Sequence, residues 1–169
     1  QFAKYLNDPS VEHHVEGGKV TIAFPGGSPD FELSWSRVDK FAAEIRDKYG
    51  VAIAESPEEV AENSDAVLLT SVDGRVHADL FRRIAPYGSP IFIDKPFAVT
   101  TEDASTIARL AEEHLVPIFS ASSIRFMDDL QAALGGIGDR GSIYGADAFG
   151  PMSLVPTQPG LFWYGIHTV

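Results

Sequence analysis

Cysteine is absent from this sequence of 169 residues. Without a thiol, the chain forms no disulfide, offers no thiolate nucleophile and binds no metal through sulfur. The absence does not decide the compartment, because it is compatible with both the cytoplasm and export. The sequence begins at Gln1 instead of Met, which leaves room for a preceding segment that has been removed.

Positively charged side chains are few: 13 Lys and Arg stand against 24 Asp and Glu, for a formal net charge of −11. This balance argues against nucleic acid or an anionic membrane surface as the main partner. Long hydrophobic runs are also missing, since no apolar stretch reaches the roughly 18 residues of a membrane-spanning helix. We therefore expect a protein that binds neither nucleic acid nor membrane, and we place it in the cytoplasm.

Several ligand-binding motifs are missing as well. No Gly-Lys-Ser/Thr occurs, which excludes a P-loop, and the histidines show no H-E-x-x-H or similar spacing, so we expect no metal site. One G-x-G-x-x-G occurs, at residues 136–141. A dinucleotide-binding loop follows a strand and opens a helix, whereas this one leaves a predicted helix and enters a predicted strand. We interpret it as a helix end followed by a turn.

Short apolar runs alternate with helix-like segments along the first 124 residues. Alternation at a spacing of about 20–25 residues is typical of βαβ units in a parallel, doubly wound sheet. The predicted fold class is therefore α/β with a Rossmann-type sheet. Strands are expected at residues 19–24, 51–54, 66–71, 91–94 and 116–120.

The helices between these strands are expected to begin at side chains that cap a helix N-terminus. A Ser or Thr at this position accepts a hydrogen bond from a backbone N–H of the first turn, and an acid three residues later completes a capping box. Gly50 is expected to end the helix over residues 37–49. The predicted N-caps are Ser36, Ser56 and Thr100.

The pattern changes after residue 124. A helix over residues 127–134 leads to residues 142–149, whose alternating side chains predict a strand of a more open sheet. A further helix is expected to start within residues 160–169. We divide the chain into an α/β domain at residues 1–124 and the truncated beginning of an α+β domain at residues 125–169.

Asp94, Lys95 and Pro96 follow the apolar run at residues 91–93 directly. A buried parallel strand that ends in this way brings polar side chains to the carboxyl edge of the sheet, where ligands bind in open α/β folds. Lys95 is therefore the first candidate for chemistry. The alternative is an ordinary surface lysine exposed to solvent.

A second polar group stands at the end of the preceding predicted strand, with Ser71, Val72 and Asp73 followed by His77 at a helix start. Such groups beside a helix N-terminus suit the ribose or nicotinamide of a cofactor, and simple helix capping is the alternative. The first strand ends instead in a turn at residues 25–29, where an acid that binds a ribose 2′-hydroxyl is usual. Asp30 stands a few residues beyond. The turn is either an altered nucleotide pocket or a structural turn, and in a pocket without that acid NADP could be accepted as well as NAD.

His167 lies on an apolar, aromatic segment at residues 160–169. From the residues alone it is either an acid/base group or a histidine packed in the core. No pattern of neighbouring residues decides between these two interpretations.

These features together resemble the glucose–fructose oxidoreductase, inositol dehydrogenase and rhizopine-catabolism (Gfo/Idh/MocA) family. Residues 94–96 are similar to the family's Glu-Lys-Pro motif. Residues 116–126 look like its last Rossmann strand and the crossing into its second domain, and residues 135–138 with the strand after them look like the start of that domain.

The chain departs from the family pattern at two places. The family's first strand and glycine-rich loop would lie before Gln1, and residues 1–7 fit the end of the helix that this loop opens. The family's D-x-G-x-H motif reads Trp163-Tyr-Gly-Ile-His167 here, so tryptophan stands where the family has an acid. The chain thus looks like a fragment with an altered substrate motif.

The resemblance implies an oxidoreductase that uses NAD or NADP and transfers a hydride to or from a sugar, polyol or derivative, in a homo-oligomer formed through the second-domain sheet. It implies a Rossmann-like nucleotide-binding domain at residues 1–124 and a substrate and oligomerisation domain that begins at residues 125–169. It implies Lys95 and His167 as catalytic residues. The substrate contacts it implies are Lys95, Arg125, Tyr164 and His167. The cofactor contacts it implies are Ser71, Val72, Asp73, His77, Asp94, Lys95 and Pro96.

Two other hypotheses remain open at this point. A catalytically reduced relative would bind a nucleotide or sugar as a sensor or partner subunit, and Trp163 favours it. The second is that a Rossmann sheet without its first strand has no activity, because the pyrophosphate site is lost.

Overall fold

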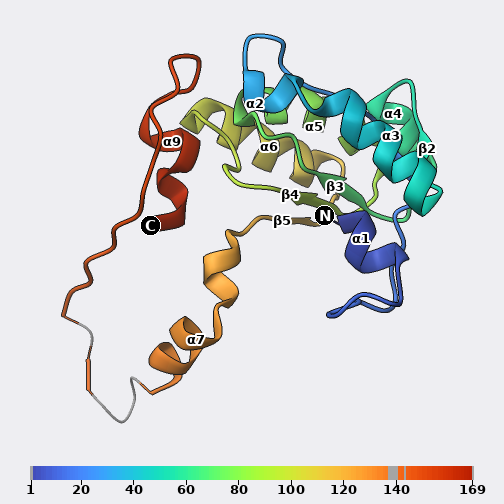
Figure 1. Cartoon of the computed structure of the whole chain (residues 1–169). Helices are drawn as coiled ribbons and strands as arrows, with labels where there is room; N and C mark the ends of the chain where they lie inside the picture. Colours follow the sequence, from blue (N-terminus) through green and yellow to red (C-terminus); the bar gives the residue numbers. More distant parts are fainter. Residues whose placement is uncertain (1, 137–140, 143, 169) are drawn as a thin grey trace.

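The computed structural model describes residues 2–136, 141, 142 and 144–168, with only the backbone for residues 162, 164, 166 and 168. Parallel strands and intervening helices make up the first two thirds of the chain, and an extended C-terminal stretch returns to them (Figure 1). The predicted α/β class with a Rossmann-type arrangement is confirmed.

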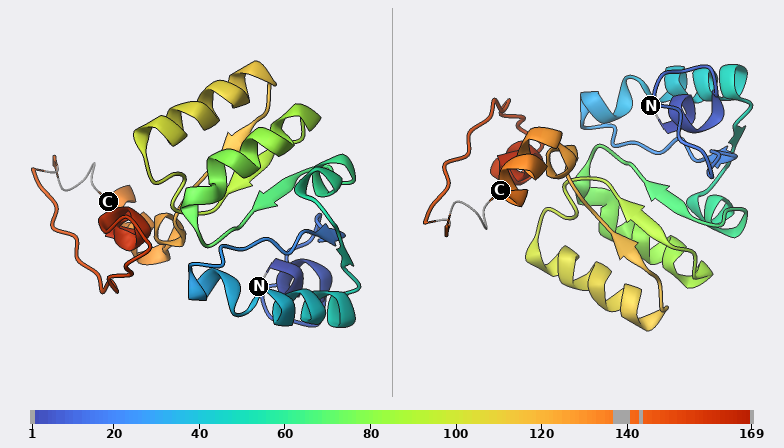
Figure 2. Two further views of the ribbon diagram at one scale, coloured as in Figure 1. Left: turned by 90° about the horizontal axis from the view of Figure 1, so that it is seen from above. Right: turned by 90° about the horizontal axis from the view of Figure 1, so that it is seen from below.

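The strands form two parallel sheets. In the first, β1 (Ile22–Ala23) pairs with β2 (Ala52–Ile53). In the second, β4 (Ile91–Ile93) lies between β3 (Val67–Leu69) and β5 (Ile118–Phe119). Figure 2 shows the first sheet and its helices beside the second, with the C-terminal segment at one end of both.

All five predicted strands are present, and all are shorter than expected. A strand extends only as far as a neighbour accepts and donates its ladder hydrogen bonds, and β1 and β3 each pair on a single side among the described residues. Apolar composition alone therefore overestimated their length.

The helices flank these sheets and connect consecutive strands (Figure 1). The short 3-10 helices are η1 (Gly74–Val76), η2 (Ala85–Tyr87), η3 (Ser123–Phe126) and η4 (Gly165–Thr168). The α-helices are α1 (Phe2–Asn7), α2 (Glu32–Trp35), α3 (Val38–Tyr49), α4 (Pro57–Glu62), α5 (His77–Ile84), α6 (Thr101–Glu113), α7 (Asp128–Gly135) and α9 (Leu161–Tyr164).

Two of the three predicted N-caps are confirmed. The Ser56 side chain accepts a hydrogen bond from the backbone N–H of Glu59, and Thr100 accepts one from that of Asp103. Ser36 was the wrong choice: Arg37 stands at the N-cap of α3, and Ser36 instead closes α2 by donating its N–H to the Glu32 carbonyl. The predicted capping box does not form because the short helix α2 ends at Ser36 and α3 starts one residue later.

The hydrophobic core lies around the three-stranded sheet. Phe81 of α5, Ile93 of β4 and Ile107 of α6 have no accessible surface. By contrast, α3 carries no buried residue, although one of its faces is apolar. Burial of apolar area drives folding, so the β3–β5 half is the better stabilised part of the chain.

The predicted strand at residues 142–149 is wrong. The described residues of this segment form no strand, and Tyr144 and Phe149 are almost fully exposed, at 99% and 97%. Alternating polarity favours a strand only where a second strand pairs with it, and no described residue does so. Gly136 does end α7 as predicted, while residues 137–140 of the G-x-G-x-x-G lie outside the described part of the chain.

Candidate active site

The Lys95–Pro96 turn lies at the carboxyl end of β4. The backbone N–H of Asp94 donates to the Leu69 carbonyl of β3 at 2.9 Å, so the ladder continues up to the turn. The Lys95–Pro96 peptide bond is cis. Pro96 packs so closely on η1 that a Cβ added to Gly74 would lie 2.7 Å from the Pro96 Cγ. The start of η1 and the turn are therefore fitted to each other.

A cavity of about 430 Å³ opens beside this turn. Lys95, Arg125 and His167 all line it, although they come from the turn after β4, from η3 and from η4, which are far apart in the sequence. Three of the four substrate contacts expected from the sequence thus meet at one place. The fourth, Tyr164, has its side chain outside the described part of the structure. The remaining lining residues are Phe97, Ser120, Ala121, Ser122, Ile124 and Leu130.

His167 is held in this cavity by a contact that the sequence did not suggest. Its Nδ1 lies 2.6 Å from the Ser122 Oγ. Burial lowers the pKa of His167 from its ordinary value, the Lys95 charge lowers the pKa further, and Asp94 opposes both effects. A lowered pKa favours the neutral imidazole at neutral pH, which is the form that accepts a proton.

The C-terminal segment is anchored at two points. Trp163 is 6% exposed and meets Phe31, which precedes α2, edge to face with 5.1 Å between the ring centroids. The Gln158 side chain donates to the Asp73 carboxylate at 3.4 Å. Trp163, at the position where the family motif has an acid, therefore serves as an aromatic anchor that keeps η4 near the cavity.

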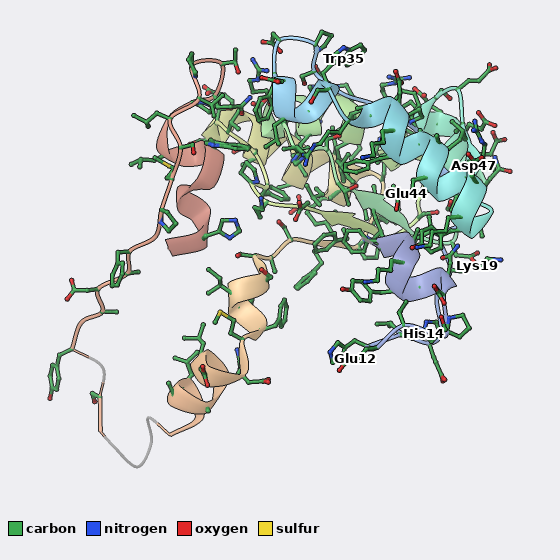
Figure 3. All side chains as sticks on the ribbon, viewed as in Figure 1. Glu12, His14, Lys19, Trp35, Glu44 and Asp47 are labelled. Carbon is green, nitrogen blue, oxygen red and sulfur yellow. The ribbon has the colours of Figure 1, made fainter. Side chains whose placement is uncertain are left out.

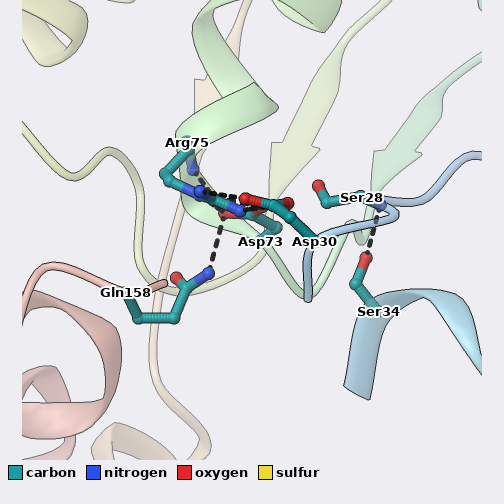
Figure 4. A network of polar contacts seen from close by, with 6 residues as sticks. All are labelled: Ser28, Asp30, Ser34, Asp73, Arg75 and Gln158. Atoms are coloured by element: carbon teal, nitrogen blue, oxygen red, sulfur yellow. Dashed lines mark hydrogen bonds and ion pairs between the residues drawn. The ribbon is translucent and has the colours of Figure 1, made fainter. Parts of the chain in front are cut away.

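Asp73 stands at the centre of a polar network that joins three segments (Figure 4). It has no accessible surface, and Arg75 donates to it at 2.7 Å and to Asp30 at 2.9 Å. Burial raises the pKa of Asp73, but hydrogen bonds from Arg75 and Ser28, with the Arg75 charge, together outweigh this and hold the pKa below its usual range. Hydrogen bonding to Arg75 also lowers the pKa of Asp30.

His77 is completely buried next to this network. Its Nε2 lies 2.9 Å from the Ser71 carbonyl oxygen, and its Nδ1 lies 3.3 Å from that of Phe97. Through these two contacts in the protein interior, His77 connects the end of β3 to the residue that follows the Lys95–Pro96 turn. Neither His77 nor Asp73 offers surface for direct contact with a ligand.

Ser71 and Val72 line a second cavity of about 230 Å³, away from the first. Its other walls come from the turn after β1 and from one face of α2 and α3, with Arg37 as its one charged side chain. Asp94 and Lys95 are half-buried and Pro96 is buried. The predicted cofactor contacts are therefore divided between a cavity wall, the central turn and the interior.

The described residues contain neither a metal-binding cluster nor a membrane-spanning helix. No group of three or more His, Asp or Glu in the described residues is placed to hold a metal ion. His14, labelled in Figure 3, has its Nδ1 2.9 Å from the Tyr5 carbonyl oxygen and belongs to a loop. None of the described helices has the length and apolar character needed to cross a bilayer.

Comparison with known proteins bears on the family and the fold of this chain. The model of an oxidoreductase family with an NAD-binding Rossmann fold, GFO_IDH_MocA, matches residues 30–122, which is more than half of the chain. The chain belongs to this family. The expected cofactor class, NAD or NADP, is confirmed by the family's description as NAD-binding. No curated protein matches the sequence.

Solved structures show the same fold at low sequence identity. Myo-inositol 2-dehydrogenase from Lactobacillus plantarum is 15% identical with a TM-score of 0.61, over 81% of this chain and 37% of that one. A probable dehydrogenase from Thermotoga maritima is 23% identical with a TM-score of 0.55, over 60% and 31%. Biliverdin reductase from Synechocystis, in complex with biliverdin and NADP+, is 20% identical with a TM-score of 0.51, over 59% and 32%.

This chain thus spans about a third of the length of the structures it resembles.

Ser122, Arg75 and Gln158 are the site-forming residues that sequence reasoning missed. The one signal that could have pointed to Ser122 is its place just after the last predicted strand of the sheet, where polar residues approach a ligand.

Proposed function

We propose that the protein is a nicotinamide-dependent oxidoreductase that transfers a hydride between NAD or NADP and a sugar, polyol or related compound. One observation carries the proposal: Lys95, Arg125 and His167 converge on one cavity at the carboxyl end of a parallel sheet, in a chain of an NAD-binding oxidoreductase family. Ligands of open α/β sheets bind at this edge.

Lys95 and His167 have complementary tasks in such a reaction. The Lys95 ammonium stabilises negative charge on the substrate oxygen, and neutral His167 accepts the hydroxyl proton during oxidation. The substrate C–H bond breaks at the same time, and its hydrogen leaves with the electron pair. A nicotinamide cofactor held at this edge would supply the acceptor for that hydride at its C4, and the hydride donor in the reverse direction. Arg125 and Tyr164 are proposed to contact the other substrate oxygens.

The cofactor is proposed to run along the carboxyl edge from the cavity of Ser71 and Val72 to the Lys95–Pro96 turn, past Asp94. The lining of that cavity contains Arg37 and no acid, which supports acceptance of a 2′-phosphate and therefore of NADP. His77 and Asp73 are proposed to act from inside by fixing the turn and the end of β3, since both are buried.

A polyol is the substrate class we favour. The structural similarity to a myo-inositol 2-dehydrogenase supports it, although at this identity the similarity concerns the fold. A catalytically reduced relative that binds a nucleotide or sugar is the second candidate. Buried Trp163, at the position of the family's acid, favours that candidate.

Self-association remains a prediction. The second-domain strand that was expected to carry it does not form in the described residues, yet this stretch exposes Tyr144 and Phe149, and Leu154 is exposed just beyond it. Such side chains are commonly covered by another protein surface.

Titration of NADH and NADPH, followed by nicotinamide fluorescence, tests the proposal. We expect saturable binding of at least one cofactor and then turnover with members of a sugar and polyol panel. Lys95→Ala should abolish turnover, whereas the matched control Lys19→Ala, on a distant exposed loop, should keep it. Failure of both cofactors to bind would refute the dehydrogenase proposal, and binding without turnover would favour the sensor.

A further inference from the structure

We propose that Ser122 is a positioning residue for proton transfer: its hydroxyl orients the His167 ring through Nδ1, so that Nε2 is the nitrogen that exchanges a proton with the substrate. The role in proton transfer rests on the proposed function, whereas the contact between Ser122 and His167 does not. The contact itself is a feature of the fold, with 2.6 Å between the Ser122 Oγ and the His167 Nδ1.

Ser122 is well suited to hold another side chain because its own position is fixed. It follows β5 and is the N-cap of η3, where its Oγ also accepts the backbone N–H of Ile124 at 3.4 Å. His167 arrives from η4, 45 residues later, on a segment anchored by Trp163. The hydroxyl is thus the fixed partner, and the imidazole is the group it orients.

The two ring nitrogens of a neutral histidine have different roles, because one carries the proton and the other a lone pair. If Nδ1–H donates to Ser122, the lone pair resides on Nε2 and can accept the substrate proton. Once Nε2 is protonated, Nδ1–H still donates to the same oxygen. One hydrogen bond therefore serves both protonation states, and the ring need not turn between them.

The charges around the ring make a neutral partner suitable. Lys95 and Arg125 line the same cavity, and Asp94 lies at the end of β4. A serine orients the imidazole without adding a further charge to this set, so His167 remains a neutral base in spite of the nearby carboxylate. A carboxylate at residue 122 would hold the ring equally well but would favour the imidazolium.

Nitrogen-15 NMR of the histidine side chains reads the tautomer directly, with His167→Gln to assign the signals. We expect neutral His167 to carry its proton on Nδ1 in the wild type, in Ser122→Thr and in the matched control Ser123→Ala, which alters the adjacent exposed residue. Ser122→Ala should shift the proton toward Nε2. A wild-type proton on Nε2, or a tautomer unaffected by Ser122→Ala, would overturn the proposal.

Ser122→Asp separates orientation from helix capping, because aspartate caps a helix as well as serine does. We expect it to raise the pKa of His167 in a proton NMR titration, since a carboxylate would then contact Nδ1. An unchanged pKa would mean that residue 122 does not contact the ring and would refute the proposal.

Kinetics supply the third readout. Ser122→Ala should lower kcat by about 10- to 100-fold with little change in KM, and Ser122→Thr should restore it. A wild-type kcat in Ser122→Ala would overturn the positioning role. If the protein binds no nicotinamide cofactor, the proposed function fails, and the NMR measurements still decide the contact between Ser122 and His167.

Discussion

Lys95 influences His167 through its charge as well as through its place beside the same cavity. Because the Lys95 ammonium is one cause of the lowered pKa of His167, replacement by the uncharged Lys95→Met should raise that pKa toward its ordinary value. A proton NMR titration of His167 measures the change, with Lys19→Met as the control. A pKa that falls or stays the same in Lys95→Met would show that the two side chains are not neighbours in solution.

His77 should contribute to stability although it was expected to contact a cofactor. His77→Leu places an apolar side chain in the core but leaves the part-buried Ser71 carbonyl without its donor. An unsatisfied buried group costs about 1–3 kcal/mol, so the urea midpoint should fall accordingly. His13→Asn changes a side chain that is 82% exposed, at a position with φ of 65° that asparagine also tolerates, and should leave the midpoint almost unchanged. Equal stability of the two variants would contradict the role given to His77.

At the residue scale, the sequence predicted those positions whose signal is local. Lys95 was found because it directly follows an apolar run, and this order of residues places it at a strand end. The contact of Ser122 with His167 and that of Asp73 with Gln158 join residues 45 and 85 positions apart. Nothing in a linear pattern indicates such pairs, because the path of the chain after α7 decides them.

Among the secondary-structure elements, η1 and the Lys95–Pro96 turn depend on the absence of a side chain at Gly74. Gly74→Ala would force its Cβ against Pro96 and Val99, and overpacking of this kind costs about 1–3 kcal/mol. We expect a lower melting temperature together with weaker turnover, since the turn carries Lys95. Gly135→Ala has no atom within 4 Å of the added carbon and should be nearly neutral. A Gly74→Ala variant as stable as the wild type would contradict this packing.

The helix starts that the sequence predicted correctly are marked by residues within the helix's own first turn. Ser56 and Thr100 cap α4 and α6 through hydrogen bonds within the first turn, and such local bonds can be inferred from spacing. The prediction for Ser36 was wrong because α2 ends at this residue, so Ser36 closes one helix instead of starting the next. The strand predicted at residues 142–149 failed for a different reason: its formation needs a pairing partner that no local pattern supplies.

Across the whole molecule, Arg75 joins the loop before α2 to the end of β3, and Gln158 extends the network to the C-terminal segment (Figure 4). Arg75→Ala would leave the buried Asp73 carboxylate without its main partner. We expect a loss of about 1–3 kcal/mol at neutral pH, below the usual cost for a fully buried pair because the arginine is partly exposed.

The same network predicts a pH dependence. Asp73 has a lowered pKa in the folded state, so its contribution is present above the unfolded-state pKa of about 4 and is lost as the pH falls through the folded-state value. The difference in stability between the wild type and Arg75→Ala should therefore shrink below about pH 4. Arg109→Ala removes an exposed ion pair with Glu113 and should show no such trend. A constant difference across the acid range would contradict the assignment.

The order of the strands is the property of the whole molecule that the sequence left open. Alternating strands and helices predicted parallel pairing correctly, but they did not predict that the strands form two separate sheets. Which strands become neighbours depends on contacts between distant segments. The cavity beside Lys95 likewise gains His167 because η4, at residues 165–168, lies close to the end of the sheet.

Transfer of deuterium from carbon-deuterated sugars and polyols to NAD+ or NADP+ tests the central claim most directly. Mass spectrometry of the recovered cofactor, with NMR to locate the label, measures it. The account predicts deuterium at nicotinamide C4 with the wild type, and a rate at least about 100-fold lower with Lys95→Met. Label transfer that is equal in Lys95→Met, or absent with every substrate in the wild type, would contradict it.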